Sequence, residues 1–269
     1  MYTLVKMFNN NNERLNWVSR RQGSFDKQIG KNPFTFIHVP KTGGRSVRLG
    51  LGLAGLGCFA TFSDLYINSP SCEPKHKEIY HSKRNKNAFI LDGHVPAIFY
   101  KDHYPEKFDK SFKFSFVRNP WDRAVSSFFW ILDESYDKLH PHRAKKEMFR
   151  EVRKKYGESR DFKAFVKAGM FRYFIKRNGS RSGPVGRPQW FWVTYNKRDI
   201  AVDFLGRFES FQKDFDTICD KIGVDRVKLP HEHKTKHKHY SEYYDAEARE
   251  IVGNMYWRDI DLFGYTFKK

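Results

Sequence analysis

The chain has 269 residues, of which 39% are hydrophobic and 17% aromatic, so it can bury a real core and wholesale disorder is excluded. Lys and Arg number 50 against 31 Asp and Glu, a formal charge of +19 that attracts anionic ligands. The three cysteines form no CxxC pair and give no support to a disulfide framework or a structural zinc site, which favours a reducing compartment. No apolar run approaches the roughly 18 residues of a membrane span, and the first residues lack a secretion signal. We therefore expect a cytoplasmic protein with no membrane partner.

The order of predicted strands along the chain indicates an α/β protein. Residues 1–30 are polar and without a sustained period, and we interpret them as an N-terminal arm before a single domain over 31–269. Short β-branched and aromatic runs bounded by turn residues predict strands at 34–39, 87–94, 112–117 and 202–209. Helix-length segments alternate with them. This alternation predicts a central parallel sheet flanked by helices, which binds ligands at the carboxyl ends of its strands.

Several helices are predicted from capping residues and apolar spacing. Asn119 is a good N-cap before Pro120, so a helix should run from there to about Asp133. The strongly basic segment 138–185 is predicted to be helical in pieces and to act as a lid or an acceptor-binding insertion. The other helices are expected at 142–155, 161–170 and 211–223 and over the last 25 or so residues.

The most informative stretch is HVPKTGGRS, residues 38–46, between a strand and a helix. Backbone N–H groups of Gly43 and Gly44 can approach an anion, since no Cβ intervenes. Lys41 adds a full charge, and Thr42 and Ser46 can donate hydroxyl hydrogen bonds. These residues predict a phosphate cradle whose order differs from GxxxxGK[ST], because the Lys precedes the glycines. The alternative is an ordinary turn with solvated side chains.

A second candidate anion site is FVRNPWDRAVSS, residues 116–127, at another strand-to-helix junction. Arg118 lies at the strand end, and Ser126 lies two turns into the helix capped by Asn119. The two could converge on one phosphate group, to which an Arg fork offers paired donors. The alternative is an Arg beside a purely structural cap.

Together, PKTGG(R)S and RNPxxRxxS resemble the two signatures of sulfotransferases that use 3′-phosphoadenosine 5′-phosphosulfate (PAPS). The downstream segments VDFLGRFESFQKDFDTIC, LPHEHKTKHKHYSEYY and YWRDIDLFGYTF are similar to the branch of that superfamily that acts on carbohydrates, which includes heparan and chondroitin sulfotransferases and bacterial relatives. The resemblance covers roughly residues 34 to 267 and implies a P-loop-like nucleotide-binding fold.

The resemblance implies a role for each matching residue. Lys41 would contact the 5′-phosphosulfate and stabilise the leaving oxygen. Arg45 replaces the family's usual small Thr or Ser, so it could bind the donor or face an anionic acceptor. The full set of implied donor contacts is Lys41, Thr42, Gly43, Gly44, Arg45 and Ser46 in the cradle, Arg118 and Ser126 at the 3′-phosphate, and Arg207, Thr235 and Lys238 near the nucleotide.

The histidines invite two interpretations. His94, in LDGHVP, matches the family's base that takes the proton of the acceptor hydroxyl, with Asp92 placed to orient it; without the resemblance it would be read as structural. A zinc site is the alternative for a cluster interleaved with lysines, whose charge opposes a cation, so we expect no metal. That cluster comprises His231, His233, His237 and His239.

The resemblance implies a PAPS-dependent sulfotransferase that acts on a hydroxyl-bearing acceptor and releases 3′-phosphoadenosine 5′-phosphate (PAP). The acceptor could be a sugar or a small natural product, and Trp190, Phe191 and Trp192 could stack on its ring. A P-loop-type kinase is the alternative enzyme, although GxxxxGK[ST] is absent. A basic nucleic-acid-binding protein would explain the charge, but the sequence has no zinc finger, helix-turn-helix or RNP signature, so we expect no nucleic-acid partner.

Overall fold

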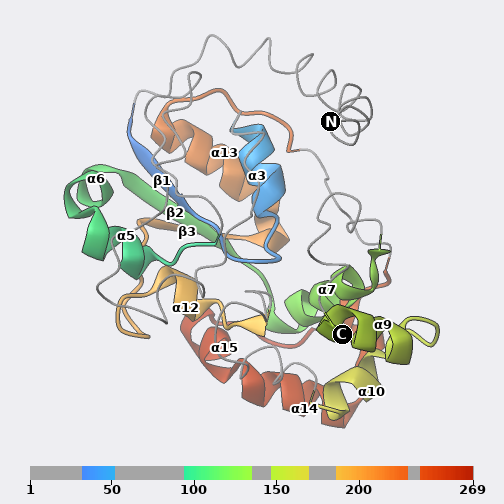
Figure 1. The fold of residues 1–269 in the computed structure, drawn as a ribbon. Helices are drawn as coiled ribbons and strands as arrows, with labels where there is room; N and C mark the ends of the chain where they lie inside the picture. The colour runs from blue at the N-terminus through green and yellow to red at the C-terminus, as the bar shows by residue number, and fades with distance from the viewer. Residues whose placement is uncertain (1–31, 52–93, 135–146, 170–185, 230–236, 269) are drawn as a thin grey trace, which may run out of the picture.

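The computed structural model describes residues 32–51, 94–134, 147–169, 186–229 and 237–268. Its sheet contains β1 (Phe34–Ile37), β2 (Phe112–Val117) and β3 (Phe204–Arg207), which are parallel and ordered β1-β2-β3 (Figure 1). Phe34 lies opposite Phe112, and Phe114 opposite Phe204. The parallel sheet with flanking helices confirms the predicted α/β class. The strand expected over 87–94 lies outside the described residues, apart from His94.

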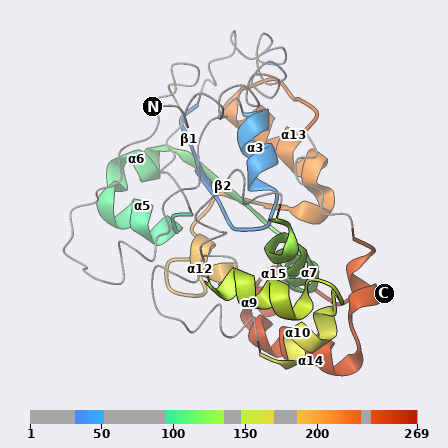
Figure 2. The ribbon, with the colours of Figure 1, turned by 45° about the vertical axis from the view of Figure 1, so that its right-hand side comes forward.

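One face of the sheet is built from phenylalanines. Phe34, Phe36, Phe114 and Phe116 are at most 1% exposed and pack against α3 (Gly44–Gly50) and α13 (Phe211–Ile222). Figures 1 and 2 show these two helices together on that side of the sheet. Because successive side chains of a strand alternate between faces, Ile37 and Val117 point the other way. They pack against α5 (Ala97–His103), α6 (Pro105–Lys110) and α12 (Trp190–Val193).

A helical layer lies beyond the carboxyl ends of the strands (Figure 1). It consists of α7 (Pro120–Leu132), α9 (Glu147–Tyr156), α10 (Phe162–Lys167), α14 (Ala246–Met255) and α15 (Trp257–Phe263). Phe128, Val152, Phe165 and Val252 share one buried cluster between them. The described part of the basic insertion, with α9 and α10, is therefore part of the core.

The start of α7 follows its predicted capping. The Asn119 side chain accepts a hydrogen bond from the Trp121 N–H at 3.1 Å, and Pro120 occupies the first turn. The helix ends at Leu132, one residue before the predicted end. This junction therefore fixes the position of Arg118, the residue immediately before the cap.

Two predicted boundaries are wrong. The strand expected over 202–209 is shorter, because the chain turns at η3 (Phe208–Ser210) into α13. The single terminal helix is instead two helices, α14 and α15, separated by Tyr256. The Tyr256 ring is buried, and its hydroxyl donates to the Gly186 carbonyl at 3.0 Å, a tertiary contact that apolar spacing does not reveal. Within the described ranges, no helix has the length and hydropathy to cross a bilayer.

Candidate active site

The loop between β1 and α3 is held by its own contacts. The backbone adopts positive φ at Lys41 (68°) and Gly43 (83°). Thr42 is fully buried, and its hydroxyl donates to the Val39 carbonyl at 2.9 Å, so in this state it stabilises the turn. A Cβ at Gly43 would meet the Phe211 ring. Packing against Phe211 therefore requires a glycine at position 43, in addition to the predicted approach of an anion to its backbone N–H.

The remaining cradle residues differ in exposure. A Cβ at Gly44 would overlap the ring of His38, which is 8% exposed. Arg45 is exposed, whereas Ser46 is 3% exposed within the first turn of α3. Arg45 can therefore meet a ligand that approaches from solvent, while Ser46 faces the interior of the fold.

The two predicted anion sites lie side by side. The Arg118 Nη1 donates to the Lys41 carbonyl at 3.3 Å. Lys41 extends across the Trp130 ring of α7, with its Nζ 5.3 Å from the ring centroid. The parallel arrangement of β1 and β2 brings both strand ends to this edge of the sheet.

Arg118 is only 8% exposed and is held on several sides. Its Nε and Nη2 donate to the two carboxylate oxygens of Asp122 at 2.7 and 2.9 Å, and its guanidinium lies 4.1 Å from the Phe208 ring centroid. Ser126, one turn beyond Asp122, is 4% exposed and is not among the described residues that line the adjoining pocket. The structure thus places Arg118 at the pocket, with Ser126 behind it in α7.

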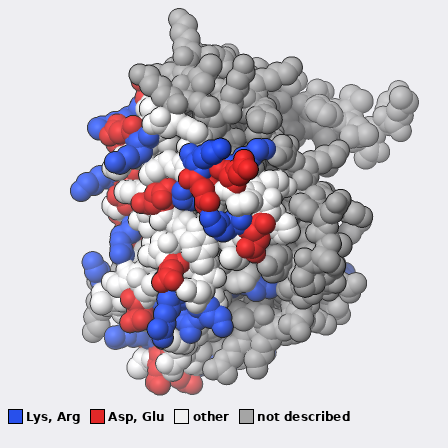
Figure 3. All heavy atoms as spheres, turned by 90° about the vertical axis from the view of Figure 1, so that its left-hand side faces the viewer, with Lys and Arg blue, Asp and Glu red and all other residues white. Residues whose placement is uncertain are grey.

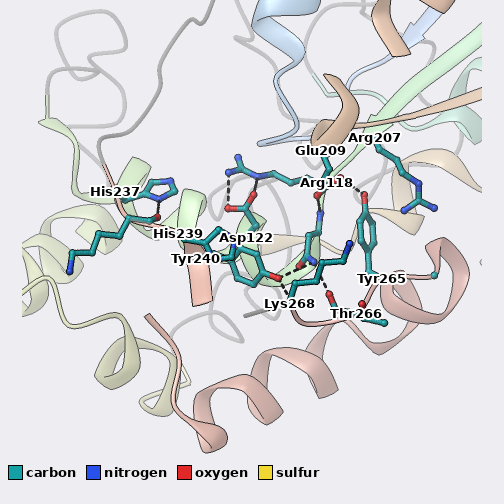
Figure 4. A pocket seen from close by; sticks show the side chains of 13 residues that line it. Arg118, Asp122, Arg207, Glu209, His237, His239, Tyr240, Tyr265, Thr266 and Lys268 are labelled. Atoms are coloured by element: carbon teal, nitrogen blue, oxygen red, sulfur yellow. Dashed lines mark hydrogen bonds and ion pairs between the residues drawn. The ribbon is translucent and has the colours of Figure 1, made fainter. Parts of the chain in front are cut away.

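A pocket of about 720 Å³ opens beside Arg118 (Figure 4). Its walls come from the start of α7, the β3–η3 junction, the segment 237–240 and the C-terminal residues. Four cations face two carboxylates around it, so its fixed charge is positive. The lining residues are Arg118, Asn119, Asp122, Arg207, Glu209, His237, Lys238, His239, Tyr240, Gly264, Tyr265, Thr266 and Lys268.

Several of these lining groups are pre-organised. Arg207 donates to the Phe263 carbonyl at 2.6 Å and lies over the Tyr265 ring at 4.9 Å. Glu209 accepts from the Asn119 N–H at 2.6 Å and from the Tyr265 hydroxyl at 3.0 Å. Burial, followed by the charge of Glu209, raises the pKa of Tyr265, so this hydroxyl stays protonated as a donor.

Arg207 and Lys238 were expected at this site from the sequence, whereas Glu209, Tyr265 and Lys268 were not. For Glu209, the only local signal in the sequence is its position two residues after Arg207. The C-terminal segment carries no local pattern that indicates a pocket wall. Thr235, His231 and His233 lie outside the described residues.

His94 lies against the same loop from the other side. Its Nδ1 is 2.9 Å from the His38 carbonyl oxygen, and the two imidazole centroids are 4.2 Å apart. A carbonyl only accepts, so Nδ1 carries the proton and Nε2 keeps its lone pair. Burial lowers the pKa of His94 to about 4; the bond to His38 raises it in part, and the charges of Arg48 and Lys41 lower it. His94 is therefore neutral near pH 7 and can accept a proton.

The aromatic run 190–192 does not provide free rings for stacking. Trp192 is 1% exposed, and its ring centroid lies 6.0 Å from that of His94. The guanidinium of Arg258 covers Trp190 at 5.0 Å, and that of Arg187 covers Phe191 at 4.7 Å. The expectation of stacking on an acceptor is corrected for Trp192, whose ring is buried in the core, whereas Trp190 and Phe191 are partly exposed with an arginine over each ring.

The described histidines of the basic loop make aromatic and polar contacts. The His237 ring stacks on Phe129 with centroids 5.4 Å apart, and His239 Nδ1 lies 2.8 Å from the Ser241 hydroxyl. In the described part of the chain, no group of three or more His, Cys, Asp or Glu side chains is arranged to hold a metal ion.

A family model described as the sulfotransferase family matches residues 28–266. The chain belongs to the sulfotransferase family. Comparisons with curated proteins and with solved structures give no match. The matched range of this sulfotransferase includes the loop 38–46, His94, Arg118 and the pocket walls as far as Thr266. The protein is accordingly a transferase that moves a sulfuryl group to an acceptor.

Proposed function

We propose that this sulfotransferase takes PAPS as its donor, transfers the sulfuryl group to a hydroxyl of a sugar or small natural product, and releases PAP. The observation that carries the proposal is the hydrogen bond between Arg118 and the Lys41 carbonyl. It joins the two motifs into one continuous anion-binding edge, as a ligand with a 5′-phosphosulfate and a 3′-phosphate requires. His94 adjoins the same edge through the His38 carbonyl.

Each residue of that edge has a proposed role. Lys41, with the loop through Ser46, holds the 5′-phosphosulfate, and Arg45 contacts its solvent side. Arg118 holds the 3′-phosphate. The other proposed donor contacts are Thr42, Gly43, Gly44, Ser126, Arg207, Thr235 and Lys238.

The reaction is an in-line displacement at sulfur. His94 Nε2 accepts the proton of the acceptor hydroxyl as its oxygen bonds to sulfur. The bond from sulfur to the bridging oxygen breaks, and Lys41 stabilises the charge that this oxygen gains. Because Lys41 and Arg48 lower the pKa of His94, an anionic donor beside them opposes that effect and makes the imidazole a stronger base.

Two broader features accompany this proposal. We propose that residues 31–269 form one domain after an arm over 1–30, since the family match spans both the sheet and the helical layer. We also propose a reducing, cytoplasmic location, because Cys219 is a free buried thiol and the three cysteines form no CxxC pair.

The alternatives receive less support. The family match and the Lys-before-Gly order disfavour a P-loop kinase. For nucleic-acid binding, Figure 3 shows that the Lys and Arg side chains of the described residues are intermingled with Asp and Glu on the face turned to the viewer. Some of the described lysines are paired with carboxylates, as in Lys101–Asp109 (2.6 Å) and Lys113–Asp203 (3.0 Å).

Calorimetric titration with PAP, and with AMP as the ligand that lacks a 3′-phosphate, tests the donor. We expect PAP to bind far more tightly than AMP, and Arg118→Ala to weaken PAP by roughly 1.5–3 kcal/mol, the contribution of a charged hydrogen-bonding group. Arg226→Ala is the matched control, because Arg226 forms a similar paired contact with Asp220 on the exposed surface. Equal affinities for PAP and AMP would contradict the proposal.

A further inference from the structure

The side chain of Gln189 holds the main chain of Arg118 from both sides. Gln189 is 0% exposed and immediately precedes α12. Its Oε1 accepts from the Arg118 N–H at 2.9 Å, and its Nε2 donates to the Arg118 carbonyl at 2.8 Å. The amide thus makes the reciprocal pair of bonds that a neighbouring strand would make, one residue beyond the end of β2.

Gln189 is itself fixed by a buried carboxylate. Asp259 of α15 is 0% exposed and accepts from the Gln189 N–H at 2.7 Å and from the Trp190 N–H at 2.8 Å. Burial raises the pKa of Asp259, while the charge of Arg123 and these two N–H donors lower it. Buried polar groups satisfied in this way keep a single arrangement, because every alternative would leave a donor unpaired.

The same segment is anchored at two further points. Arg123 of α7 donates to the Arg187 carbonyl at 2.7 Å, and the Tyr256 hydroxyl donates to the Gly186 carbonyl at 3.0 Å. Residues 186–190 are therefore held in place by α7 and by the α14–α15 junction. Three residues past Gln189, Trp192 packs near His94, with ring centroids 6.0 Å apart.

We infer that Gln189 is a positioning residue: it holds Arg118 where its guanidinium can bind the donor's 3′-phosphate. It also anchors the short helix α12, which packs Trp192 beside His94. The inference rests on the proposed function, because it assigns the 3′-phosphate to Arg118. Without the amide, the Arg118 main chain would have an N–H and a carbonyl without partners and could shift. A misplaced Arg118 can cost at most what its removal costs, so the loss of PAP affinity is bounded by that of Arg118→Ala.

The test compares binding of PAP and AMP to Gln189→Met, which keeps the length of the side chain and removes both hydrogen bonds. We expect the PAP dissociation constant to rise roughly ten- to hundredfold while AMP binding changes little, since AMP lacks the phosphate that Arg118 contacts. A merely structural role would weaken both ligands alike. Thr35→Val is the matched control, because it removes the buried Thr35–Ser111 hydrogen bond (2.7 Å) at the opposite end of β1 and β2. It should leave the ratio of the PAP and AMP dissociation constants unchanged.

Hydrogen exchange of the ligand-free protein gives a second readout that needs no donor. The Arg118 amide should exchange faster in Gln189→Met than in the wild type or in Thr35→Val. If Gln189→Met does not fold, Gln189→Asn replaces it: this variant keeps an amide but its side chain is one methylene shorter, so both bonds to the Arg118 main chain are weakened and a partial fall in the preference for PAP over AMP is expected.

The outcomes separate the two claims. A wild type that does not distinguish PAP from AMP refutes the proposed donor. A wild type that prefers PAP, loses this preference in Arg118→Ala and retains it in the Gln189 variants overturns the positioning role alone. Unchanged exchange of the Arg118 amide overturns that role as well.

Discussion

Acid should destabilise this sulfotransferase through its buried imidazoles, and His94→Gln should remove a measurable share of that effect. The pKa of His94 is about 4 in the folded protein, against about 6.5 for an exposed imidazole. Between these values the unfolded chain binds the proton more strongly, so stability is fully present above pH 6.5 and declines as the pH falls toward 4. From pH 7 to pH 5, the two pKa values give a loss of about 2 kcal/mol from His94 alone.

His38 acts in the same direction. Burial, then the charges of His94 and Arg48, lower its pKa well below the ordinary value. Because His94 itself stays neutral between pH 7 and pH 5, His94→Gln leaves the contribution of His38 in place, and the pH-dependent loss should shrink by about 2 kcal/mol in the variant.

Urea unfolding followed by tryptophan fluorescence at pH 7, 6 and 5 measures this loss for wild type and variant. Thr35→Val serves as the control, since it loses a buried hydrogen bond without removing a titrating group. An identical fall in unfolding free energy from pH 7 to pH 5 in wild type and His94→Gln would refute the assignment of a buried, neutral imidazole.

Three further changes test the loop and the core. Lys41→Ala should lower kcat by about 10²-fold or more with the fold intact, because the proposed stabilisation of the leaving oxygen by Lys41 is removed; a near-normal kcat in a donor-saturated assay would contradict this role. Gly43→Ala should cost at least about 2 kcal/mol of unfolding free energy, because alanine is strained at φ 83° and its methyl meets Phe211. Adding Phe211→Leu should recover only the part of this loss that comes from the contact between the methyl group and the Phe211 ring. Recovery of the whole loss would contradict the contribution of backbone strain. Trp192→Ala should cost about 3–5 kcal/mol in urea unfolding, as for a buried core aromatic, and a loss below about 1 kcal/mol would contradict its burial.

The sheet and the start of α7 could be predicted because their determinants are local. Alternating phenylalanines define β1 and β2, and the sequence Asn119–Pro120 defines a helix start without tertiary information. The pairing of Arg118 with Asp122 also follows an i,i+4 spacing. What the pattern did not predict was the break at Tyr256, where the bond to Gly186 spans 70 positions.

Distance along the chain also explains which site residues were missed. Gln189 contacts Arg118 across 71 positions, and Asp259 contacts Gln189 across 70. Neither residue lies in a motif, because a buried amide or carboxylate that binds distant backbone groups requires no particular residues beside it in the sequence. The misread aromatic run has the same cause: from sequence alone, Trp192 could equally have faced a ligand or the core.

Three cations at this site are held in place by contacts within the protein. Arg118 is bound by Asp122 and the Phe208 ring, Arg207 by the Phe263 carbonyl, and Lys41 lies over Trp130. Side chains fixed in this way lose little conformational freedom when an anion binds, so more of the interaction energy is available for binding and for the transition state. The two carboxylates of the pocket limit its net charge and hold its donors in place. A site of this kind selects a ligand by the spacing of its charges, which a surface of mobile lysines with the same total charge could not do.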